Sequence, residues 1–557
     1  MKKVLIPLVT ILVISFLLTA CGNATSSTPS PTPSAISSPT ASKPAASLPS
    51  SPVAPASSVA PAPSSATAKP TSTAATPTYG GVLRIIETRG PSTTLGWYAE
   101  NSASSGPYTY PVIETLLRVS FENQVTPLLA EGYKVADDLK SITLNIRKGV
   151  KFHDGSTMDG AAVKWNLDQM LAAKVSPTTT WSSIDLVDDY TVRINLSAYR
   201  NTILNDLASY AGNIISPTAY NSKGKDWVRW NPVGTGPFKF VSFERDVSVK
   251  YAKFSDYWQK GLPYLDGVEY SFITDPMTQS AAFQNKEADS IGDNVGKVMV
   301  DLAASQKGSV IVANPSGVIG LVGDSANADS PFSKLQVRQA LDYAIDRDSI
   351  TKARGYGYSQ PIYQFAFVGT PNYITNLANR SYNPDKAKQL LTDAGYPSGF
   401  STTMTCDAGS ADKDAMTAVQ NNLSKVGINA QFVWADNASY LKARTGGWKN
   451  GVLAGAIGLD ANENNSFSRY FLKVSANYPS MIKGGALEDM FTASLTAKSY
   501  DPALMQKMIQ YLYDNALTTN LWNISHANLV QPYVHGGGFM SQQTWPGWIP
   551  ESAWISK

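Results

Sequence analysis

Residues 401–434 read STTMTCDAGSADKDAMTAVQNNLSKVGINAQFVW. Residues 401–406 predict a strand, residues from about 411 to 425 predict a helix, and residues 428–434, after Gly427, predict a second strand. A strand, a helix and a strand in this order are typical of a βαβ unit, whose helix connects two parallel strands. The stretch therefore predicts an α/β fold with a parallel or mixed sheet.

Two further helices are predicted before this unit. Apolar residues recur with the period of one helix face at Val337, Ala340, Leu341, Ala344 and Ile345. Later, Asn383 is suited to an N-cap, Pro384 to the first helical position and Gly395 to the residue after the helix. Both patterns indicate helices that pack on the predicted sheet.

The region before these helices contains more strands. Residues 80–86 begin with a glycine pair that is followed by a short, mostly apolar strand. Residues 141–147 and 192–196 alternate apolar with polar side chains. A helix is predicted between them, from Met158 to Leu171. Residues 118–220 are thus expected to form a strand-rich α+β unit.

The first 21 residues have the composition of a secretory signal. Lys2 and Lys3 precede an apolar run that ends at Thr19-Ala20-Cys21. Leu18-Thr19-Ala20-Cys21 resembles a bacterial lipobox, so we expect residues 1–20 to be a signal peptide and Cys21 to carry the lipid that holds the protein on the membrane. An uncleaved membrane helix is the competing interpretation, but the run of about 17 residues is at the lower limit for spanning a bilayer.

Residues 21–78 contain almost no large apolar side chains after the cysteine. They are nearly all Ser, Thr, Pro and Ala, a composition that predicts a disordered spacer. Cys406 is the only other cysteine of the chain and has no partner once Cys21 is acylated, so we expect a small buried thiol and no disulfide.

The remaining residues are too many for one core. Roughly 480 residues exceed the roughly 250–300 at which a single core stops growing, so two or three lobes are expected. The formal charge of the whole chain is only +3. Near-neutrality argues against a nucleic acid as partner.

Several short blocks in this part together resemble one family. The blocks are TPLLAE at 126–131, RKGVKFHDG at 147–155, VGTGPF at 233–238, DYW at 256–258, GLPYLD at 261–266, VRQALDYAIDR at 337–347, KAKQLL at 386–391 and AGY at 394–396. In this order and spacing they resemble the family 5 extracellular solute-binding proteins, the peptide/nickel type that serve ABC importers.

The resemblance implies a mixed α/β, three-lobe clamshell of the type II-like, cluster C kind. Lobe I would be discontinuous, and the implied boundaries are 79–117, 221–315 and 528–557 for lobe I, 118–220 for the inserted lobe II and 316–527 for lobe III. The two large lobes would close over a solute. The resemblance also implies the partners: a small-molecule ligand, a peptide by default, with ABC permease and ATPase subunits, for a monomeric receptor outside the cytoplasm.

Most blocks are predicted to be structural. Gly234 and Gly236 would allow a turn that a Cβ would obstruct, and Asp154-Gly155 is predicted as a turn. For Arg338 two interpretations remain, a pair with an acid of another lobe and a solvated helix face.

The candidates for ligand contact lie elsewhere, and they are Trp97, Tyr98, Trp434, Asp460, Asn462, Trp522 and His526. In peptide-binding relatives the loop here at 455–464 holds a Trp and then an Asp that takes the ligand's ammonium group. Asp460 matches that acid, whereas Ile457 stands where the Trp would be. Packing in a core is the competing interpretation for the aromatic residues, and a loop cap for Asp460. A buried carboxylate without a partner would need a ligand cation.

Enzyme functions find little support in the sequence. His535-Gly-Gly-Gly538 resembles an esterase oxyanion loop, but no Gly-x-Ser-x-Gly elbow accompanies it. The three histidines, His153, His526 and His535, form no zinc motif, and no phosphate-binding loop is present. We therefore expect neither metal nor cofactor. A sensing or adhesion lipoprotein with the same fold remains the alternative, with an extracellular hydrolase more remote.

Overall fold

The computed structural model describes residues 76–91, 93–100, 106–120, 124–292, 297–306, 310–537 and 548–556. The predicted signal peptide, Cys21 and the spacer as far as residue 75 lie outside the described residues. In the described part, none of the helices has the length and apolar character needed to cross a membrane.

A ten-stranded mixed sheet runs through residues 82–530, in the order β14-β13-β15-β12-β16-β11-β1-β10-β9-β8. One end, here called the β8 half, contains β1 (Val82–Glu87), β8 (Phe238–Glu244), β9 (Ser248–Lys253), β10 (Gly267–Phe272) and β11 (Ser290–Ile291). The other end, the β14 half, contains β13 (Phe400–Asp407), β14 (Ile428–Ala435) and β15 (Gly451–Gly458).

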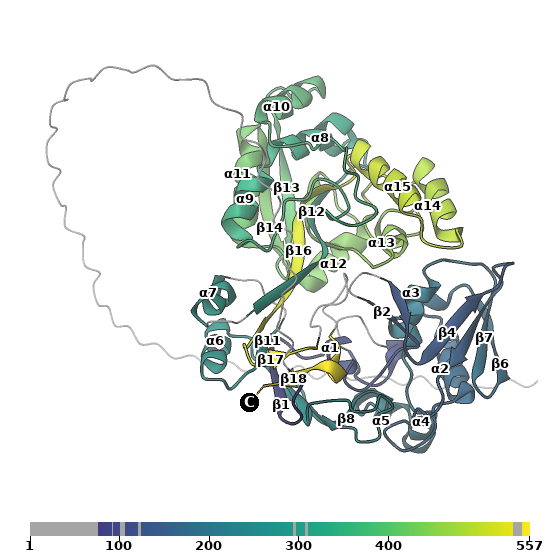
Figure 1. The fold of residues 1–557 in the computed structure, drawn as a ribbon. Coiled ribbons are helices and arrows are strands. Elements are labelled where there is room, and N and C mark those ends of the chain that lie inside the picture. Colours follow the sequence, from purple (N-terminus) through teal and green to yellow (C-terminus); the bar gives the residue numbers. More distant parts are fainter. Residues whose placement is uncertain are drawn as a thin grey trace, which may run out of the picture. The chain divides into compact units, whose positions relative to one another are not determined.

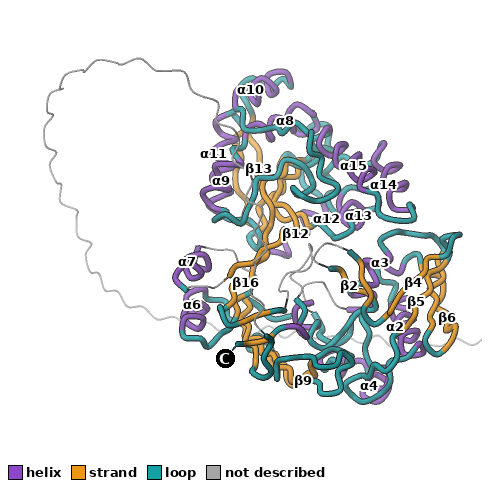
Figure 2. Tube along the Cα trace, in the orientation of Figure 1, coloured by secondary structure: helices purple, strands orange, loops and turns teal. Residues whose placement is uncertain are grey.

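Two long strands connect these halves. β12 (Val310–Gly323) and β16 (Thr519–Val530) pair antiparallel along most of their length. The two strands lie side by side in the structure (Figures 1 and 2). β12 also pairs with β15, and β16 also pairs with β11. The two strands are therefore the part of the sheet that both halves share.

The β14 half confirms the predicted βαβ unit. β13 and β14 are parallel, and α11 (Lys413–Lys425) connects them. Alternate residues of the strands face two different cores: Ile319 of β12 packs with α8 (Leu335–Ala344), α10 (Pro384–Asp393) and α11, whereas Val318 packs on the other face. The helices of that other face are α12 (Asn437–Gly446), α13 (Glu463–Tyr470), α14 (Ala486–Thr496) and α15 (Pro502–Asp514). Cys406 is fully buried in the first of these cores, as predicted.

A separate antiparallel sheet confirms the predicted α+β unit. It has the order β4-β5-β7-β6, formed by β4 (Ala130–Val135), β5 (Ser141–Ile146), β7 (Thr191–Leu196) and β6 (Trp181–Asp188). α2 (Gly160–Ala172) begins at Asp159, whose side chain accepts a hydrogen bond from the amide of Ala162, and it packs on β6. The core of this unit is continuous with that of the β8 half.

The remaining elements are short or lie beside the large sheet. The strands pair as β2 (Leu117–Val119) with β3 (Val125–Pro127) and as β17 (Val534–His535) with β18 (Trp554–Ile555). The helices are α1 (Gly106–Thr109), α3 (Ile203–Leu207), α4 (Pro217–Lys223), α5 (Lys225–Trp230), α6 (Pro276–Gln284), α7 (Lys297–Ser305) and α9 (Arg347–Arg354).

The sequence blocks at 147–155 and 233–238 meet in the core. The Nε2 atom of His153 lies 2.9 Å from the carbonyl oxygen of Gly236, and burial lowers the pKa of His153 to about 4. The neutral ring therefore donates to this carbonyl. A Cβ on Gly234 would stand 2.1 Å from the carbonyl oxygen of Val112. The predicted obstruction is confirmed, and its cause is the close approach of another backbone segment.

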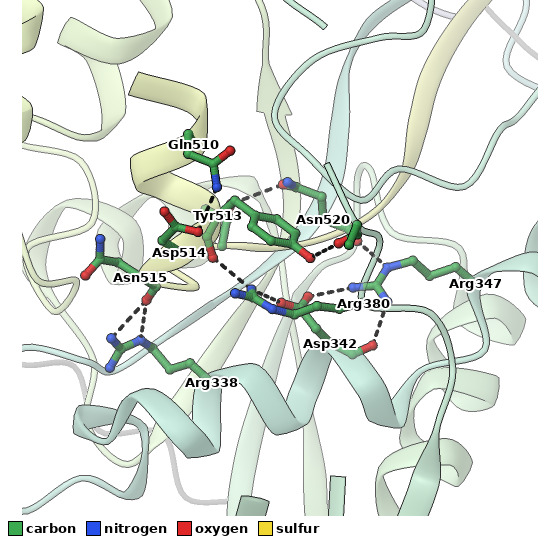
Figure 3. Close-up of polar contacts among 11 residues, drawn as sticks. Arg338, Asp342, Arg347, Arg380, Gln510, Tyr513, Asp514, Asn515 and Asn520 are labelled. Carbon is green, nitrogen blue, oxygen red and sulfur yellow. Dashed lines mark hydrogen bonds and ion pairs between the residues drawn. The ribbon is translucent and has the colours of Figure 1, made fainter. Parts of the chain in front are cut away.

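The expectation for Arg338 is wrong in both forms. Arg338 is only 5 % exposed, and its guanidinium donates to the carbonyl group of Asn515 (Figure 3). It also donates to the carbonyl groups of Phe332 and Ser333, and to no acid. Asn515 follows the last residue of α15. Arg338 thus supplies donors to a carbonyl group that the end of α15 leaves without an intrahelical partner, and to two carbonyl groups of the segment before α8.

Candidate functional site

A cavity of about 420 Å³ lies between residues 199–210, which include α3, and residues 460–477, which include α13. We call it the Asp206 cavity. Its charged lining residues are Arg200, Asp206, Asp460 and Arg469, and its polar ones include Asn205, Asn462 and Asn465. The cavity thus brings both signs of charge together with several amide groups.

Asp460, the predicted acid, is already paired in this cavity. Its Oδ1 accepts from Arg469 at 2.8 Å, and its Oδ2 accepts from the hydroxyl of Ser466 at 2.9 Å. Both partners belong to α13, directly after the loop. The carboxylate therefore does not have the unsatisfied state that would by itself require a ligand cation.

Asp206 is the second carboxylate of the cavity and is not paired in this way. It is 9 % exposed, and its partners are the hydroxyl of Thr202 at 3.2 Å and the amide of Asn465 at 3.4 Å. No basic side chain of the described residues lies within ion-pair distance of it. Burial raises the pKa of Asp206 to about 7, because desolvation of the charged form outweighs the hydrogen bonds from Asn465 and Thr202 and the coulombic attraction of Arg200.

Arg200 is the basic counterpart of Asp206. Its single hydrogen bond is a long one, 3.4 Å, to the hydroxyl of Thr179, and its Nε is buried without a partner among the described groups. Arg200 and Asp206 are the only charged residues between Arg193 and Lys223. That isolation is the one signal in the sequence for these two residues. Neither was among the candidates predicted from the sequence.

Asn462, also predicted, contacts the other wall. Its Nδ2 donates to Oδ1 of Asn201 at 3.2 Å, and Asn464 donates to the same oxygen at 3.2 Å. Asn201 in turn donates through Nδ2 to the carbonyl of Ser494 at 2.8 Å. Its backbone amide donates to the carbonyl of Leu495 at 2.9 Å. We call this buried group the Asn201 bridge. It connects the segment before α3 to α13 and α14.

Another cavity of about 460 Å³ is lined by Asn201 and Asn462 as well. Its wall contains Glu463, which accepts from Tyr500 at 2.7 Å and from Asn372 at 3.1 Å. Burial raises the pKa of Glu463 to about 7. Glu463, like Asp206, has only neutral donors, but its hydrogen bonds of 2.7 and 3.1 Å are shorter than those of Asp206. The basic residue of this lining, Lys498, is already paired with Asp137 at 3.2 Å.

Trp97 and Tyr98 lie in a core. The ring of Trp97 packs 5.0 Å from Tyr220 and 6.5 Å from Trp165 between ring centroids. Tyr98 is fully buried, and its hydroxyl donates to the carbonyl of Asn166 in α2 at 3.0 Å. Neither residue lines the Asp206 cavity.

The other aromatic candidates are also separate from Asp460. Trp434 lies on β14, the edge strand, and its ring stacks beside Phe432. Trp522 of β16 lines a mainly apolar cavity of about 470 Å³ beside α7 and α9, where the rim cation Arg354 is paired with Asp412. The backbone of His526 lies in β16, but its side chain is outside the described part.

The residues that the structure describes contain no cluster of three or more His, Cys, Asp or Glu side chains that could hold a metal ion. Buried carboxylates among these residues have hydrogen-bond donors of the protein as partners. Glu114, for example, accepts from Thr235, Tyr257 and Trp258, residues of the 233–238 and 256–258 blocks. Burial raises its pKa to about 7.

Comparison with known sequences identifies similar proteins. A family model described as "Bacterial extracellular solute-binding proteins, family 5 Middle" matches residues 124–479. The glutathione-binding protein GsiB of Salmonella paratyphi A is 34% identical over 352 residues, which are 62% of this chain and 68% of that protein. GsiB of Pectobacterium atrosepticum is 32% identical over 368 residues, 65% of this chain and 71% of that protein.

Solved structures share the fold. AgaA from A. tumefacien R10, in complex with agropinic acid, is 27% identical with a TM-score of 0.69 and aligns over 86% of this chain and 99% of its own. NikA from Brucella suis, in complex with Fe(III)-EDTA, is 21% identical with a TM-score of 0.75 over 84% of this chain and 98% of its own. DppA from Helicobacter pylori, in complex with the peptide STSA, is 22% identical with a TM-score of 0.71 over 86% of this chain and 99% of its own.

Proposed function

Since the chain belongs to the bacterial extracellular solute-binding proteins of family 5, we propose that it captures a small, peptide-like solute in the Asp206 cavity and delivers it to an ABC importer. It is a solute-binding protein and not an enzyme. The observation that supports this choice of site is the presence of Asp206 and Arg200, two opposite charges without ion-pair partners among the described residues, in one cavity with the 460–464 loop.

The ligand class is proposed from the relatives together with the cavity. The GsiB relatives are glutathione-binding proteins, and the H. pylori neighbour was solved with a peptide. Peptides and glutathione carry ammonium and carboxylate groups joined by amide bonds. The charges and side-chain amides of the cavity suit such a solute, because buried polar groups of a ligand need hydrogen-bond partners.

Capture would involve a hinge motion. We place lobe I at 79–117, 221–315 and 528–557, lobe II at 118–220 and lobe III at 316–527, so that β12 and β16 cross between lobes I and III. The walls of the Asp206 cavity belong to lobe II and lobe III, and lobe II shares its core with the β8 half, so lobe II would move together with lobe I. A solute that contacts both walls only in the closed form would favour closure. The importer's permease and ATPase subunits would then receive the solute from the closed, monomeric receptor.

Location outside the cytoplasm follows from the family, and a lipid on Cys21 would hold the protein at the membrane. We expect Cys21→Ser to release the protein from the membrane fraction, because the acyl chains are then absent. Retention of the variant in the membrane fraction would instead indicate an uncleaved apolar helix. The wild-type chain, fractionated in parallel, is the control.

The proposed function is tested by identifying the solute. Protein purified gently and then denatured should release a small molecule that mass spectrometry identifies reproducibly. A peptide or a glutathione-like molecule would support the proposed ligand class. A single non-peptide solute would overturn that class, and repeated release of nothing, together with no binding to any offered solute, would contradict solute capture.

A further inference from the structure

We infer that Asp206, rather than Asp460, receives the ammonium group of the solute while Arg200 receives its carboxylate group, so that the substrate class is a zwitterion. This assignment rests on the proposed function, since it concerns the same cavity. It differs from the expectation that the family resemblance gives for the loop acid. The contacts of the four charged lining residues decide between the two acids.

Asp460 is neutralised by its own segment. Arg469 and Ser466 occupy one oxygen each, and the backbone amide of Asp460 donates to the same Ser466 hydroxyl at 2.8 Å. The side chain of Asp460 is 16% exposed and that of Arg469 is 43% exposed, so water reaches the pair mainly from the guanidinium side. A ligand ammonium at Asp460 would compete with a guanidinium that is already in place.

Asp206 has no such competitor. Its two neutral donors, Thr202 and Asn465, hold it with one hydrogen bond each at 3.2 and 3.4 Å. A buried carboxylate retains most of its desolvation cost when its partners are neutral and distant. An ammonium group in the cavity would supply the missing charge and a short, charge-assisted hydrogen bond.

Arg200 is a basic side chain that lacks an acidic partner among the described residues. Its guanidinium makes one 3.4 Å hydrogen bond, and the Nε proton is buried without an acceptor among the described residues. Coulombic attraction from Arg200 offsets part of the rise that burial causes in the pKa of Asp206, but no described acid lies within 4.0 Å of Arg200, so the two side chains form no direct ion pair. A carboxylate can accept two parallel hydrogen bonds from a guanidinium, which makes it the matching group.

The two charges together select a zwitterion. A solute with only an ammonium would leave Arg200 unpaired, and one with only a carboxylate would leave Asp206 unpaired. The volume of about 420 Å³ is in the range of small-molecule sites and limits the solute to a few residues. Both charged residues lie on one segment six positions apart, Arg200 before α3 and Asp206 within it, so that one wall presents both groups.

The test is calorimetric titration with defined probes. The probes are glutathione and L-alanine oligomers of one to four residues, each oligomer also as its N-acetyl and its C-amide derivative. The variants are Asp206→Asn and Arg200→Gln, with Asp460→Asn as the rival site. Asp185→Asn and Arg193→Gln, which remove the same charges from an exposed pair on β6 and β7, are the matched controls. A thermal unfolding scan of each variant verifies that it folds.

We expect at least one zwitterionic probe to bind the wild-type protein. N-acetylation and Asp206→Asn should each weaken its binding about tenfold to a hundredfold, and the two changes together should weaken it no more than either alone. C-amidation and Arg200→Gln should likewise each weaken binding about tenfold to a hundredfold, and the two together should weaken it no more than either alone. The controls should bind as the wild type does.

Two results would overturn the inference. If Asp460→Asn, and not Asp206→Asn, removes the discrimination against N-acetylated probes, the ammonium binds at the loop acid. If no zwitterionic probe binds but a solute of another class copurifies with the protein, the inference and the proposed ligand class fail, whereas solute capture for an importer stands. Binding of no solute at all would defeat both.

Discussion

Arg338 places a formal charge in the interior without an acid as partner. Desolvation lowers its pKa to about 10, so the guanidinium stays charged at neutral pH while it serves three carbonyl groups. Nearby, Arg347 and Arg380 share the carboxylate of Asp342 (Figure 3). The 337–347 block therefore attaches α8 to the end of α15 and to the start of β16, where the carbonyl of Asn520 accepts from Arg347.

We expect Arg338→Met to destabilise the protein by about 2–4 kcal/mol, because the carbonyl groups of Asn515, Phe332 and Ser333 lose their donors inside the core. The loss should appear as a lower unfolding midpoint in a thermal scan. Arg193→Met, at an exposed ion pair, should cost less than about 1 kcal/mol. Equal effects of the two substitutions would contradict the structural role of Arg338.

Glu114 makes stability depend on pH. Its pKa is raised to about 7 in the folded protein, mainly by desolvation, from an ordinary value of 4.5. Between these values the unfolded chain has lost the proton and the folded chain keeps it, so stability falls as the pH rises from about 4.5 to about 7. Asp206 and Glu463, with pKa values also raised to about 7, act in the same direction.

Glu114→Gln should therefore reduce the loss of stability between pH 5 and pH 8, measured as unfolding midpoints across this range. The dependence should not vanish, because Asp206 and Glu463 still titrate. Asp275→Asn is the control, since hydrogen bonds from Thr278 hold the pKa of Asp275 below its usual 3.8, outside the window. A slope as steep in Glu114→Gln as in the wild type would refute the assignment.

The glycines of the 233–238 block allow this segment to contact the backbone of residues 111 and 112 closely. Neither Gly234 nor Gly236 has a left-handed backbone, yet an added Cβ would stand 2.1 and 2.7 Å from carbonyl oxygens of residues 112 and 111. The amide of Gly236 also donates to the carbonyl of Val112 at 2.9 Å. The block is thus a place where two backbone segments touch.

We expect Gly234→Ala to destabilise the fold by more than about 3 kcal/mol or to prevent folding, because backbone atoms must move to admit the methyl group. Gly446→Ala is the control: Gly446 ends α12, and nothing stands within 4 Å of the position of its Cβ. That substitution should change stability by less than about 1 kcal/mol. Soluble expression and unfolding midpoints measure both variants.

The Asn201 bridge connects parts of the chain that are far apart in sequence. Its members come from residues 201, 462–464 and 494–495, and nearby the hydroxyl of Tyr199 donates to the carbonyl of Lys498 at 2.8 Å. The contacts are polar hydrogen bonds, which are individually weak in net free energy. Such an interface can open and close without the loss of either core.

Asn201→Ala should loosen this interface, because Asn462, Asn464 and the carbonyl of Ser494 lose their common partner. We expect amide hydrogen exchange in residues 199–210 and 494–499 to become about tenfold faster or more, a loss of about 1.4 kcal/mol in the opening free energy. Asn195→Ala, on the exposed face of β7, should leave both segments unchanged. Mass spectrometry of exchanged peptides provides the measurement.

The amino-acid sequence by itself determined the family, the α/β class and a subset of the regular elements, namely α2, α8, α10, α11, β1, β5, β7, β13 and β14. The physical reason is that periodicity, caps and turn residues act over a few positions. Asn383, for instance, caps α10 through a contact only three residues long. Such signals are complete within one short segment.

Only the tertiary structure decided which polar residues are satisfied. Arg338 and Asp460 looked like candidates for a distant acid and for a ligand, yet Asn515, Phe332 and Arg469 already satisfy them. Asp206 carried no motif and became a candidate because no described cation is close to it. Some partners are near in sequence, such as Arg469 for Asp460, and others are distant, such as Asn515 for Arg338. In both cases burial and pairing depend on how the segments pack in three dimensions, which a linear pattern does not record.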